Sequence, residues 1–264
     1  MKIRAYDDLH CEFNQYEFEP LPNDDQTVCI LAGDIGQGER PSTWMPTILR
    51  ASKRFEHVIY VLGNHEYYFG EYPTTIQNMR NEIAKHNLTN VHLLENQFIE
   101  IDGVSFIGAT LWTDFNRGNP VDMHMANHGL SDYRLIKVAK EGEHVIKGPY
   151  TRNIIPSDII VLHNTSKAYI IKTTLEQKSK GNKIVLVVHH GVTNRSLNPF
   201  YENDPLNPAF CSELSEELLQ IEPDLIIHGH VHYARDYYVD EDNKIPEIFE
   251  DNNKVELILN SVKS

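Results

Sequence analysis

Five short apolar runs in this sequence each end in side chains that bind metals. The end residues are Asp8 and His10; Asp34; Asn64 and His65; His189 and His190; and His228, His230 and His232. Runs of this length and composition are typical of β-strands, and helical patterns lie between them. Such alternation predicts an α/β fold. In α/β sheets, sites form beyond the carboxyl ends of the strands, so residues spread over most of the chain can converge there.

The coarse pattern along the chain is strand, loop and helix, repeated. We expect strands at 2–6, 28–33, 58–64, 183–191, 224–232, 234–239 and 254–260, and helices near 42–55, 73–87, 157–180 and 211–221. The stretches "VHLLEN" and "GVSFIGATLW" look like adjacent strands, and residues 112–156 look irregular. Because no linker divides the chain, we expect residues 1–264 to form a single domain.

Composition limits the possible partners. The chain has 24 basic and 38 acidic residues, which gives a formal net charge of 24 − 38 = −14. An acidic surface repels a phosphate backbone, so no extended nucleic-acid-binding face is expected. The sequence also has no apolar run of about 18 residues, which a membrane-spanning helix would need. The oligomeric state is left open.

The cysteines and the N-terminus suggest a compartment. Cys11, Cys29 and Cys211 are far apart and odd in number, so neither a disulfide framework nor a structural zinc knot is expected. The first residues, "MKIRAYDD", lack the apolar core of a secretory signal. We therefore expect a reducing, cytoplasmic setting.

The end residues form a mixed set of oxygen and nitrogen donors without thiolates. Such a set suits Mn²⁺, Fe, Zn²⁺, Co²⁺ or Ni²⁺ better than Ca²⁺ or a soft metal, and there are enough donors for two ions. If the chain is extended at Asp8–His10 and at His230–His232, each pair points to one side. Taken singly, each motif has an ordinary explanation, such as a turn, a helix cap or a buried neutral histidine. The prediction of a metal centre rests on all five motifs occurring in order.

In this order the motifs resemble those of the calcineurin-like metallophosphoesterases. That family carries Asp-x-His, Gly-Asp, Gly-Asn-His-Glu/Asp, His and Gly-His-x-His, and this chain has all five over residues 8 to 232. The resemblance implies a two-sheet β-sandwich flanked by helices, a four-layer αββα fold, with a dinuclear metal site at one edge. It also implies a hydrolase that cleaves phosphomonoester or phosphodiester bonds, for which manganese is the first metal to test.

The resemblance assigns a role to each matching residue. It implies that Asp8, His10 and His232 hold one metal, that Asn64, His189 and His230 hold the other, and that Asp34 bridges the two. His65 matches the position that contacts the phosphate and protonates the leaving group. His190 is the fallback for His189, and we interpret His228 as a residue that packs behind the ligands.

Two metals about 3.5–4 Å apart suit phosphoester hydrolysis, because they neutralise phosphate oxygens and lower the pKa of a bridging water that becomes the attacking hydroxide. Asp34 would hold that spacing. His65 would supply positive charge or a proton where the leaving oxygen develops charge. Asn64 and His65 therefore count as catalytic or substrate-binding candidates.

The substrate is less constrained than the metal site. The expected substrate is a small or nucleotide-like phosphoester, recognised by segments 111–130, 132–137 and 191–201. Candidate contacts are Trp112, Phe115 and Tyr201 for stacking and Arg117, Arg134 and Arg195 for phosphate. A packed aromatic or a solvated arginine is the alternative for each. Two other functions remain open: a nuclease of the same fold, and a non-catalytic scaffold, which would be expected to lose ligands that this chain keeps. The segment "IGQGER" after Asp34 lacks the Asp-Arg-Gly extension of serine/threonine protein phosphatases, which argues against that activity.

Overall fold

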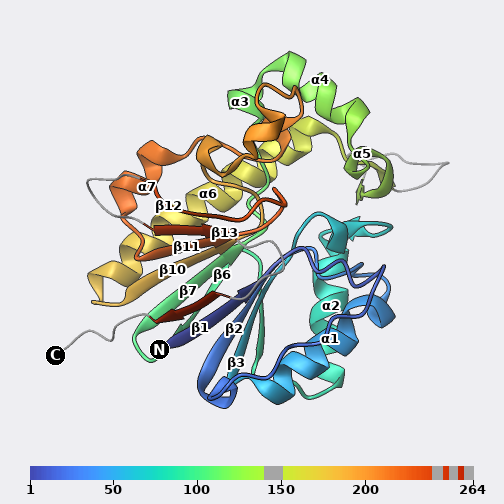
Figure 1. Ribbon diagram of the computed structural model, residues 1–264. Helices are drawn as coiled ribbons and strands as arrows, with labels where there is room; N and C mark the ends of the chain where they lie inside the picture. The colour runs from blue at the N-terminus through green and yellow to red at the C-terminus, as the bar shows by residue number, and fades with distance from the viewer. Residues whose placement is uncertain (140–150, 240–245, 250–254, 259–264) are drawn as a thin grey trace.

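Two mixed β-sheets pack face to face, and helices cover the outer face of each (Figure 1). The computed structural model describes residues 1–139, 151–239, 246–249 and 255–258. The predicted four-layer αββα sandwich is confirmed.

The first sheet has the strand order β14-β1-β2-β3-β5. Its strands are β1 (Lys2–Tyr6), β2 (Thr27–Ala32), β3 (His57–Val61), β5 (Val91–Leu94) and β14 (Val255–Ile258). All neighbours are parallel except β14, which runs antiparallel to β1. Helices α1 (Pro41–Arg54) and α2 (Thr74–Lys85) cover its outer face.

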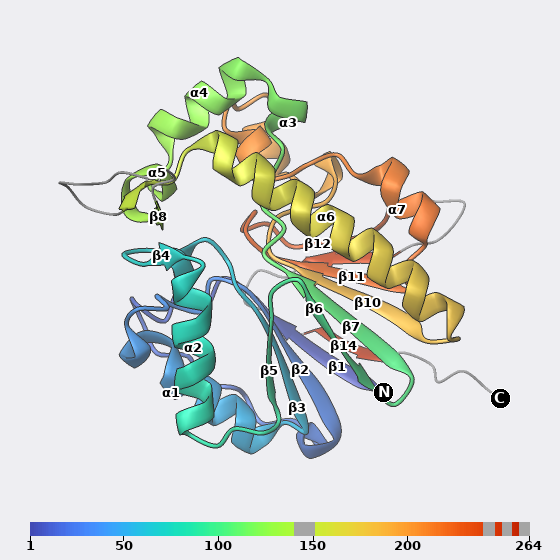
Figure 2. The ribbon, with the colours of Figure 1, turned by 180° about the vertical axis from the view of Figure 1, so that it is seen from behind.

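The second sheet has the order β12-β13-β11-β10-β7-β6. Its strands are β6 (Gln97–Ile101), β7 (Val104–Ala109), β10 (Lys183–Val188), β11 (Leu225–His228), β12 (Arg235–Tyr238) and β13 (Pro246–Phe249). Strands β7, β10, β11 and β13 run parallel to one another. At the two edges, β6 runs antiparallel to β7 and β12 runs antiparallel to β13. Helices α6 (Pro156–Ser179) and α7 (Ser215–Ile221) lie over its outer face (Figure 2).

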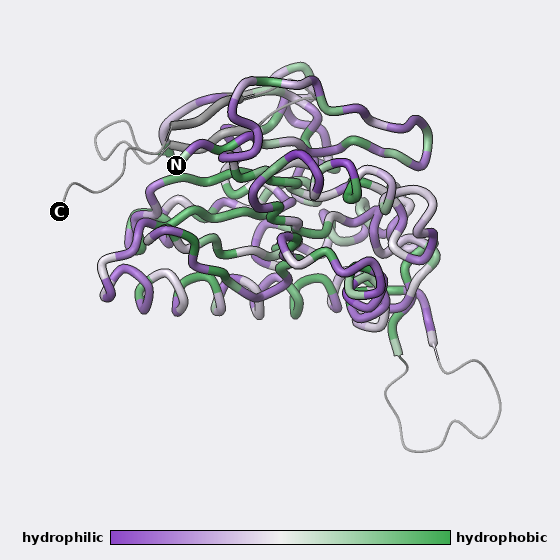
Figure 3. The backbone as a smooth tube through the Cα atoms, turned by 90° about the horizontal axis from the view of Figure 1, so that it is seen from below, coloured by the Kyte–Doolittle hydropathy of each residue, from purple (hydrophilic) through white to green (hydrophobic). Residues whose placement is uncertain are grey.

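Strict alternation along the strands builds three apolar layers. In β2, Val28 and Ile30 face the other sheet, whereas Cys29 and Leu31 face α1 and α2. In β10, Val185 and Val187 likewise fill the space between the sheets, and the residues between them pack under α6 and α7. Burying each such side chain contributes about 1.5–3 kcal/mol. In Figure 3 the strands carry long hydrophobic stretches, whereas the helices alternate between hydrophobic and hydrophilic residues.

Two expectations about the middle of the chain are wrong. β5 and β7 are not adjacent strands, because β5 belongs to the first sheet, β7 to the second, and the intervening β6 pairs with β7. Residues 112–156 are not simply irregular either. They contain α3 (Phe115–Gly118), α4 (Pro120–Gly129) and α5 (Asp132–Leu135), followed by β8 (Lys137–Ala139) and β9 (Thr151–Asn153), which form a small sheet with β4 (Glu71–Tyr72).

Among the described residues, no helix has both the length and the hydropathy that crossing a membrane requires.

Candidate metal centre

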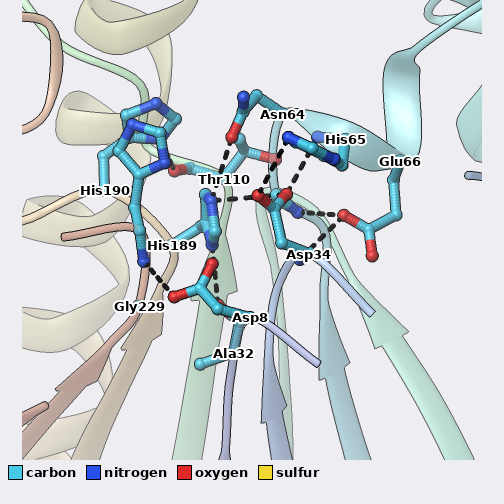
Figure 4. Close-up of polar contacts among 12 residues, drawn as sticks. Asp8, Ala32, Asp34, Asn64, His65, Glu66, Thr110, His189, His190 and Gly229 are labelled. Atoms are coloured by element: carbon cyan, nitrogen blue, oxygen red, sulfur yellow. Dashed lines mark hydrogen bonds and ion pairs between the residues drawn. The ribbon is translucent and has the colours of Figure 1, made fainter. Parts of the chain in front are cut away.

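The carboxyl ends of the parallel strands of both sheets meet at one edge of the sandwich. There the chain brings together the residues that we call the ligand cluster: Asp8, His10, Asp34, Asn64, His189, His230 and His232. The first sheet supplies both carboxylates and the amide, and the second sheet supplies three of the four imidazoles. Figure 4 shows Asp8, Asp34, Asn64 and His189 pointing toward one another from different strands.

Asp8, His10 and His232 form the first group. Each offers one ligand atom, and these atoms all lie within 4.8 Å of one another. His232 Nε2 is 3.4 Å from Asp8 Oδ1 and 3.4 Å from His10 Nε2. This is the set that the sequence assigned to one metal.

Asp34, His189 and His230 form the second group, also with ligand atoms within 4.8 Å of one another. His189 Nε2 lies 3.1 Å from Asn64 Oδ1 and 3.5 Å from Asp34 Oδ1. Asp34 also belongs to a group with His10 and His65. Its carboxylate therefore lies between the two sets, where a bridging ligand would have to be.

The backbone at these positions is left-handed rather than extended. Asp8, His10, Asp34, His230 and His232 have φ values of 48°, 44°, 53°, 73° and 48°. The extended chain that we assumed for the Asp8–His10 and His230–His232 pairs is therefore wrong. Left-handed backbone costs roughly 1–3 kcal/mol at each such residue and persists only where the surroundings impose it. Hydrogen bonds between the loops do so here: Asp8 N donates to Gly33 O at 3.0 Å, and His10 N donates to Asp34 O at 2.9 Å.

Two glycines let the loops approach this closely. A Cβ atom on Gly33 would lie 2.2 Å from His189 Nδ1, and a Cβ atom on Gly63 would lie 2.2 Å from Asp34 Oδ1. Neither distance is possible for a real side chain. Glycine at these two positions is therefore a requirement of the cluster itself.

The cluster fits divalent metal ions. Asp8 and Asp34 are 6% and 1% exposed, and buried carboxylates need positive charge beside them. Asp8 Oδ1 and His230 Nε2 are buried without a hydrogen-bond partner among the described residues. His189 Nδ1 donates to Ala32 O at 2.9 Å, which leaves Nε2 free to coordinate. The donor set is that of a borderline transition metal.

The electrostatics of the metal-free chain agree with this reading. Burial alone would raise the pKa of Asp34, but the positive charges of His189 and His65 outweigh it and hold the pKa well below its usual range. Burial would lower the pKa of His189, yet Asp34 and Asp8 raise it to about 9. A protonated His189 thus balances buried carboxylate charge in the absence of metal, and a metal ion bound at its Nε2 would have to displace that proton.

Glu66 holds the loops of the first sheet together. Its buried carboxylate accepts hydrogen bonds from Ile35 N at 2.7 Å, Gly63 N at 2.6 Å and the Tyr60 hydroxyl at 2.8 Å. Burial, with the charge of Asp34, raises the pKa of Glu66 to about 7. The sequence interpretation noted the Gly-Asn-His-Glu block but gave Glu66 no role.

Glu12 and Asp132 were also missed. Glu12 Oε1 lies 2.8 Å from His65 Nδ1 and 3.4 Å from His10 Nδ1, so one carboxylate contacts two histidines of the site. Asp132 Oδ1 accepts from Asn64 Nδ2 at 3.0 Å and thereby directs the amide oxygen toward His189. The spacing of Glu12 two residues after His10 was the available signal. Asp132 opens the candidate recognition segment 132–137, but its contact with Asn64 was not predicted.

His65 stands beside the cluster with its ring partly exposed. Its Nε2 lies 3.9 Å from Asp34 Oδ2, and its ring stacks on Tyr68 at 4.3 Å between centroids. Burial would lower the pKa of His65, but Asp34 and Glu12 raise it to about 9, so the ring carries a proton at neutral pH. His65 is thus placed to donate that proton or to face a phosphate oxygen.

His190 and His228, the other two histidines of the five sequence motifs, contact groups outside the ligand cluster. His190 Nδ1 lies 3.1 Å from Thr110 O, and His228 Nε2 lies 2.9 Å from Ser196 Oγ. Neither belongs to the two groups described above. This geometry supports His189 as the ligand and His228 as a packing residue.

A cavity of about 640 Å³ opens over the cluster. Residues of the first loop, of 129–132 and of 197–210 line it, so the expected segments 111–130 and 191–201 contribute only their ends. Trp112 and Phe115 are buried in the core and cannot stack on a substrate.

None of the three candidate arginines, Arg117, Arg134 and Arg195, is among the described residues that line this cavity. Arg195 donates to Tyr238 O at 2.6 Å and lies over the Tyr237 ring. Arg134 contacts His128 O and Ser131 Oγ, both at 3.3 Å. Neither is among the lining residues, and the phosphate-binding role that we predicted for them is not supported by this geometry.

Comparison with known proteins decides the family. The calcineurin-like phosphoesterase family model matches residues 4–234, a stretch that contains the whole ligand cluster and His65. The chain belongs to the calcineurin-like phosphoesterase family. The predicted family is confirmed, and with it the class of the protein: a metal-dependent phosphoester hydrolase.

Two further comparisons show what this chain is similar to. An uncharacterized protein of Acanthamoeba polyphaga mimivirus is 27% identical over 262 residues, covering 88% of this chain and 85% of the viral protein. The crystal structure of phosphopantetheinyl hydrolase from Mycobacterium tuberculosis is similar as well. The match covers 94% of this chain and 88% of the hydrolase chain, with a TM-score of 0.65 and 17% sequence identity. At that identity the likeness shows the calcineurin-like phosphoesterase fold alone.

Proposed function

We propose that this chain hydrolyses a small phosphoester at a centre of two divalent or transition-metal ions. Asp8, His10 and His232 would hold one ion, Asn64, His189 and His230 would hold the other, and Asp34 would be shared by the two sets. When bound, the ions supply charge neutralisation at the phosphate and activate the water that attacks phosphorus.

The protein's own residues supply position and a proton. Glu66 fixes the loops that carry Asp34 and Asn64, so the two sets of ligands keep their spacing. His65, oriented through Nδ1 by Glu12, presents Nε2 toward the cavity as general acid for the leaving oxygen. Asp132 holds the amide of Asn64.

A single observation carries this proposal. Asp34 is the one acidic residue shared by two of the ligand groups found among the described residues, and it is 1% exposed. A buried carboxylate placed between two sets of histidine and carboxylate donors suits a pair of cations better than one.

The test is metal content combined with a substrate panel. Protein loaded with Mn²⁺, Fe²⁺, Zn²⁺, Co²⁺ or Ni²⁺ is assayed with 4-nitrophenyl phosphate, bis(4-nitrophenyl) phosphate, a cyclic nucleotide and single-stranded DNA. We expect up to two ions per chain, hydrolysis of a small ester and loss of activity with a chelator. If no ester is cleaved at full metal occupancy, the proposed function is wrong.

The same panel tests the alternatives. Preferential cleavage of DNA would favour a nuclease, against which the net charge of −14 argues. Binding of metal without hydrolysis of any substrate would favour a non-catalytic scaffold. Manganese as the native metal and a cytoplasmic location belong to this proposal as expectations, and the panel decides between monoester and diester cleavage.

A further inference from the structure

The cavity over the ligand cluster has an unusually apolar side. We call this side the apolar wall: Phe13, Leu130, Leu197, Tyr201, Leu206 and Phe210. These residues come from three segments far apart in the sequence, and all line the same cavity. Apolar side chains that converge on a concave site are typical of a surface that binds the organic part of a ligand.

Away from the ligand cluster and His65, the described lining of this cavity carries no cationic side chain. It contains no lysine or arginine among the described residues, and its histidines belong to the cluster or are His65 itself. Away from the cluster, the wall region carries Asp204, whose Oδ1 accepts from Leu206 N at 2.8 Å. A second phosphate or a carboxylate on the substrate would meet this negative charge without a cation to pair with.

Two aromatic side chains of the apolar wall are largely exposed to solvent. Phe13 is 75% exposed and Tyr201 is 54% exposed. Neither is needed to fill the core. Exposed aromatic residues grouped at a cavity mark a binding surface more often than scattered ones do. Phe200, which is 84% exposed, does not line the cavity itself, but its ring packs edge-on against Tyr201 with 5.0 Å between centroids.

The wall reaches down to the metal ligands. The ring of Phe210 stacks on His230 with 4.6 Å between centroids and 24° between planes. On the opposite side, Phe13 lies 6.3 Å from the His10 ring. A group attached directly to the phosphate would therefore meet apolar surface as soon as it leaves the cluster.

We propose that the substrate carries one phosphate ester and an uncharged, mainly apolar alkyl or aromatic group that packs on the apolar wall. This inference rests on the phosphoesterase function proposed above. In the reaction water adds across the P–O ester bond: phosphorus gains the hydroxyl, and the leaving oxygen gains the proton. Nucleoside di- and triphosphates and carboxylated esters are disfavoured substrates.

The test uses matched esters that differ in one charge. Hexyl phosphate is compared with 5-carboxypentyl phosphate, and the hexyl ester of 4-nitrophenyl phosphate with its 5-carboxypentyl ester, on the metal-loaded full chain. The first pair reports a monoesterase and the second a diesterase. For whichever pair is hydrolysed, we expect kcat/KM to favour the hexyl ester by at least about tenfold, the effect of a buried, unpaired charge.

Wall variants test whether this surface is the cause. Phe13→Ala and Tyr201→Ala should each raise KM for the hexyl ester about three- to tenfold, through loss of aromatic contact area, and so reduce the preference. Tyr201→Arg should raise kcat/KM for the carboxypentyl ester, because it adds the missing cation at an exposed position. Phe98→Ala, at an exposed position of β6 away from the cavity lining, is the control and should leave the preference unchanged, with circular dichroism and metal content checked for all.

The outcomes separate the two proposals. Equal kcat/KM for hexyl and carboxypentyl esters, or a preference that survives in Phe13→Ala and Tyr201→Ala alike, overturns the substrate class and leaves the phosphoesterase function standing. Absence of hydrolysis of every ester, 4-nitrophenyl phosphate included, overturns both.

Discussion

The ligand cluster and the apolar wall face the same cavity but are built in opposite ways. The cluster follows the ends of buried strands, and hydrogen bonds between loops hold its left-handed backbone. The wall comes mostly from the segment 197–210, which has only short helical turns at Pro199–Tyr201 and Asn207–Ala209 and is largely exposed or half-buried. If the wall binds the substrate as proposed, the metal ligands are positioned by strand ends and the substrate contacts come mostly from a loop.

The largest effect should come from the residue that joins the two halves of the cluster. Asp34→Asn keeps the size of the side chain but removes the charge between the two sets of ligands. We expect it to lose more metal than any other single ligand change, with activity falling to that of the buffer. Elemental analysis and the ester assay measure both. Full occupancy in this variant would contradict the bridging role.

The adjacent histidines after β10 provide the next comparison. His189→Ala should lose about one ion per chain, because its Nε2 faces Asp34 and Asn64. His190→Ala should keep its metal, because that ring contacts Thr110 O instead. Metal titration of the two variants decides between them, and the reverse result would shift our ligand assignment by one residue.

His65 should affect chemistry more than metal binding. If it protonates the leaving oxygen, His65→Ala should lower kcat by about 10²–10⁴-fold for alkyl esters and much less for nitrophenyl esters, whose leaving group departs without a proton. An equal loss for both would mean that His65 acts mainly by stabilising phosphate charge. Wild-type rates on both classes would remove it from the mechanism.

Substitution of Glu12 tests whether His65 depends on this carboxylate for its orientation. Glu12→Ala should lower kcat for alkyl esters by about 10–100-fold, because His65 and His10 both lose the carboxylate that orients them. Glu12→Gln keeps an acceptor and should recover part of the loss. Glu17→Gln, at a side chain that is 76% exposed, is the matched control. A fall in activity without partial recovery would point to charge rather than orientation.

The residues of the ligand cluster could be predicted because the ends of the strands can be recognised in the sequence. Apolar runs that end in Asp34 or His189 reveal both the strand and the ligand, and parallel strands bring their ends to one edge. The left-handed backbone at Asp8 and His230 could not be read from the sequence. It depends on hydrogen bonds between loops that are far apart in the chain.

The wall could not be predicted, because its residues share no spacing. Phe13 and Phe210 belong to different loops, and only the packing of those loops places both at one cavity. The arginines were predicted to bind phosphate only because of their residue type. In the structure Arg195 instead donates a hydrogen bond to a backbone carbonyl of β12. A residue type therefore predicts a chemical role only where a helix or strand also determines which way the side chain points.

The smallest effect should come where the wall touches the cluster. Phe210→Leu keeps an apolar side chain but loses the stacked ring on His230. Because the smaller side chain offers the alkyl group less contact area, we expect KM for the hexyl ester to rise about two- to tenfold while metal content stays at the wild-type value. Phe98→Leu, at an exposed position of β6, is the control. If Phe210→Leu instead loses metal, the ring is supporting His230, and the wall and the cluster cannot be treated as separate parts of the site.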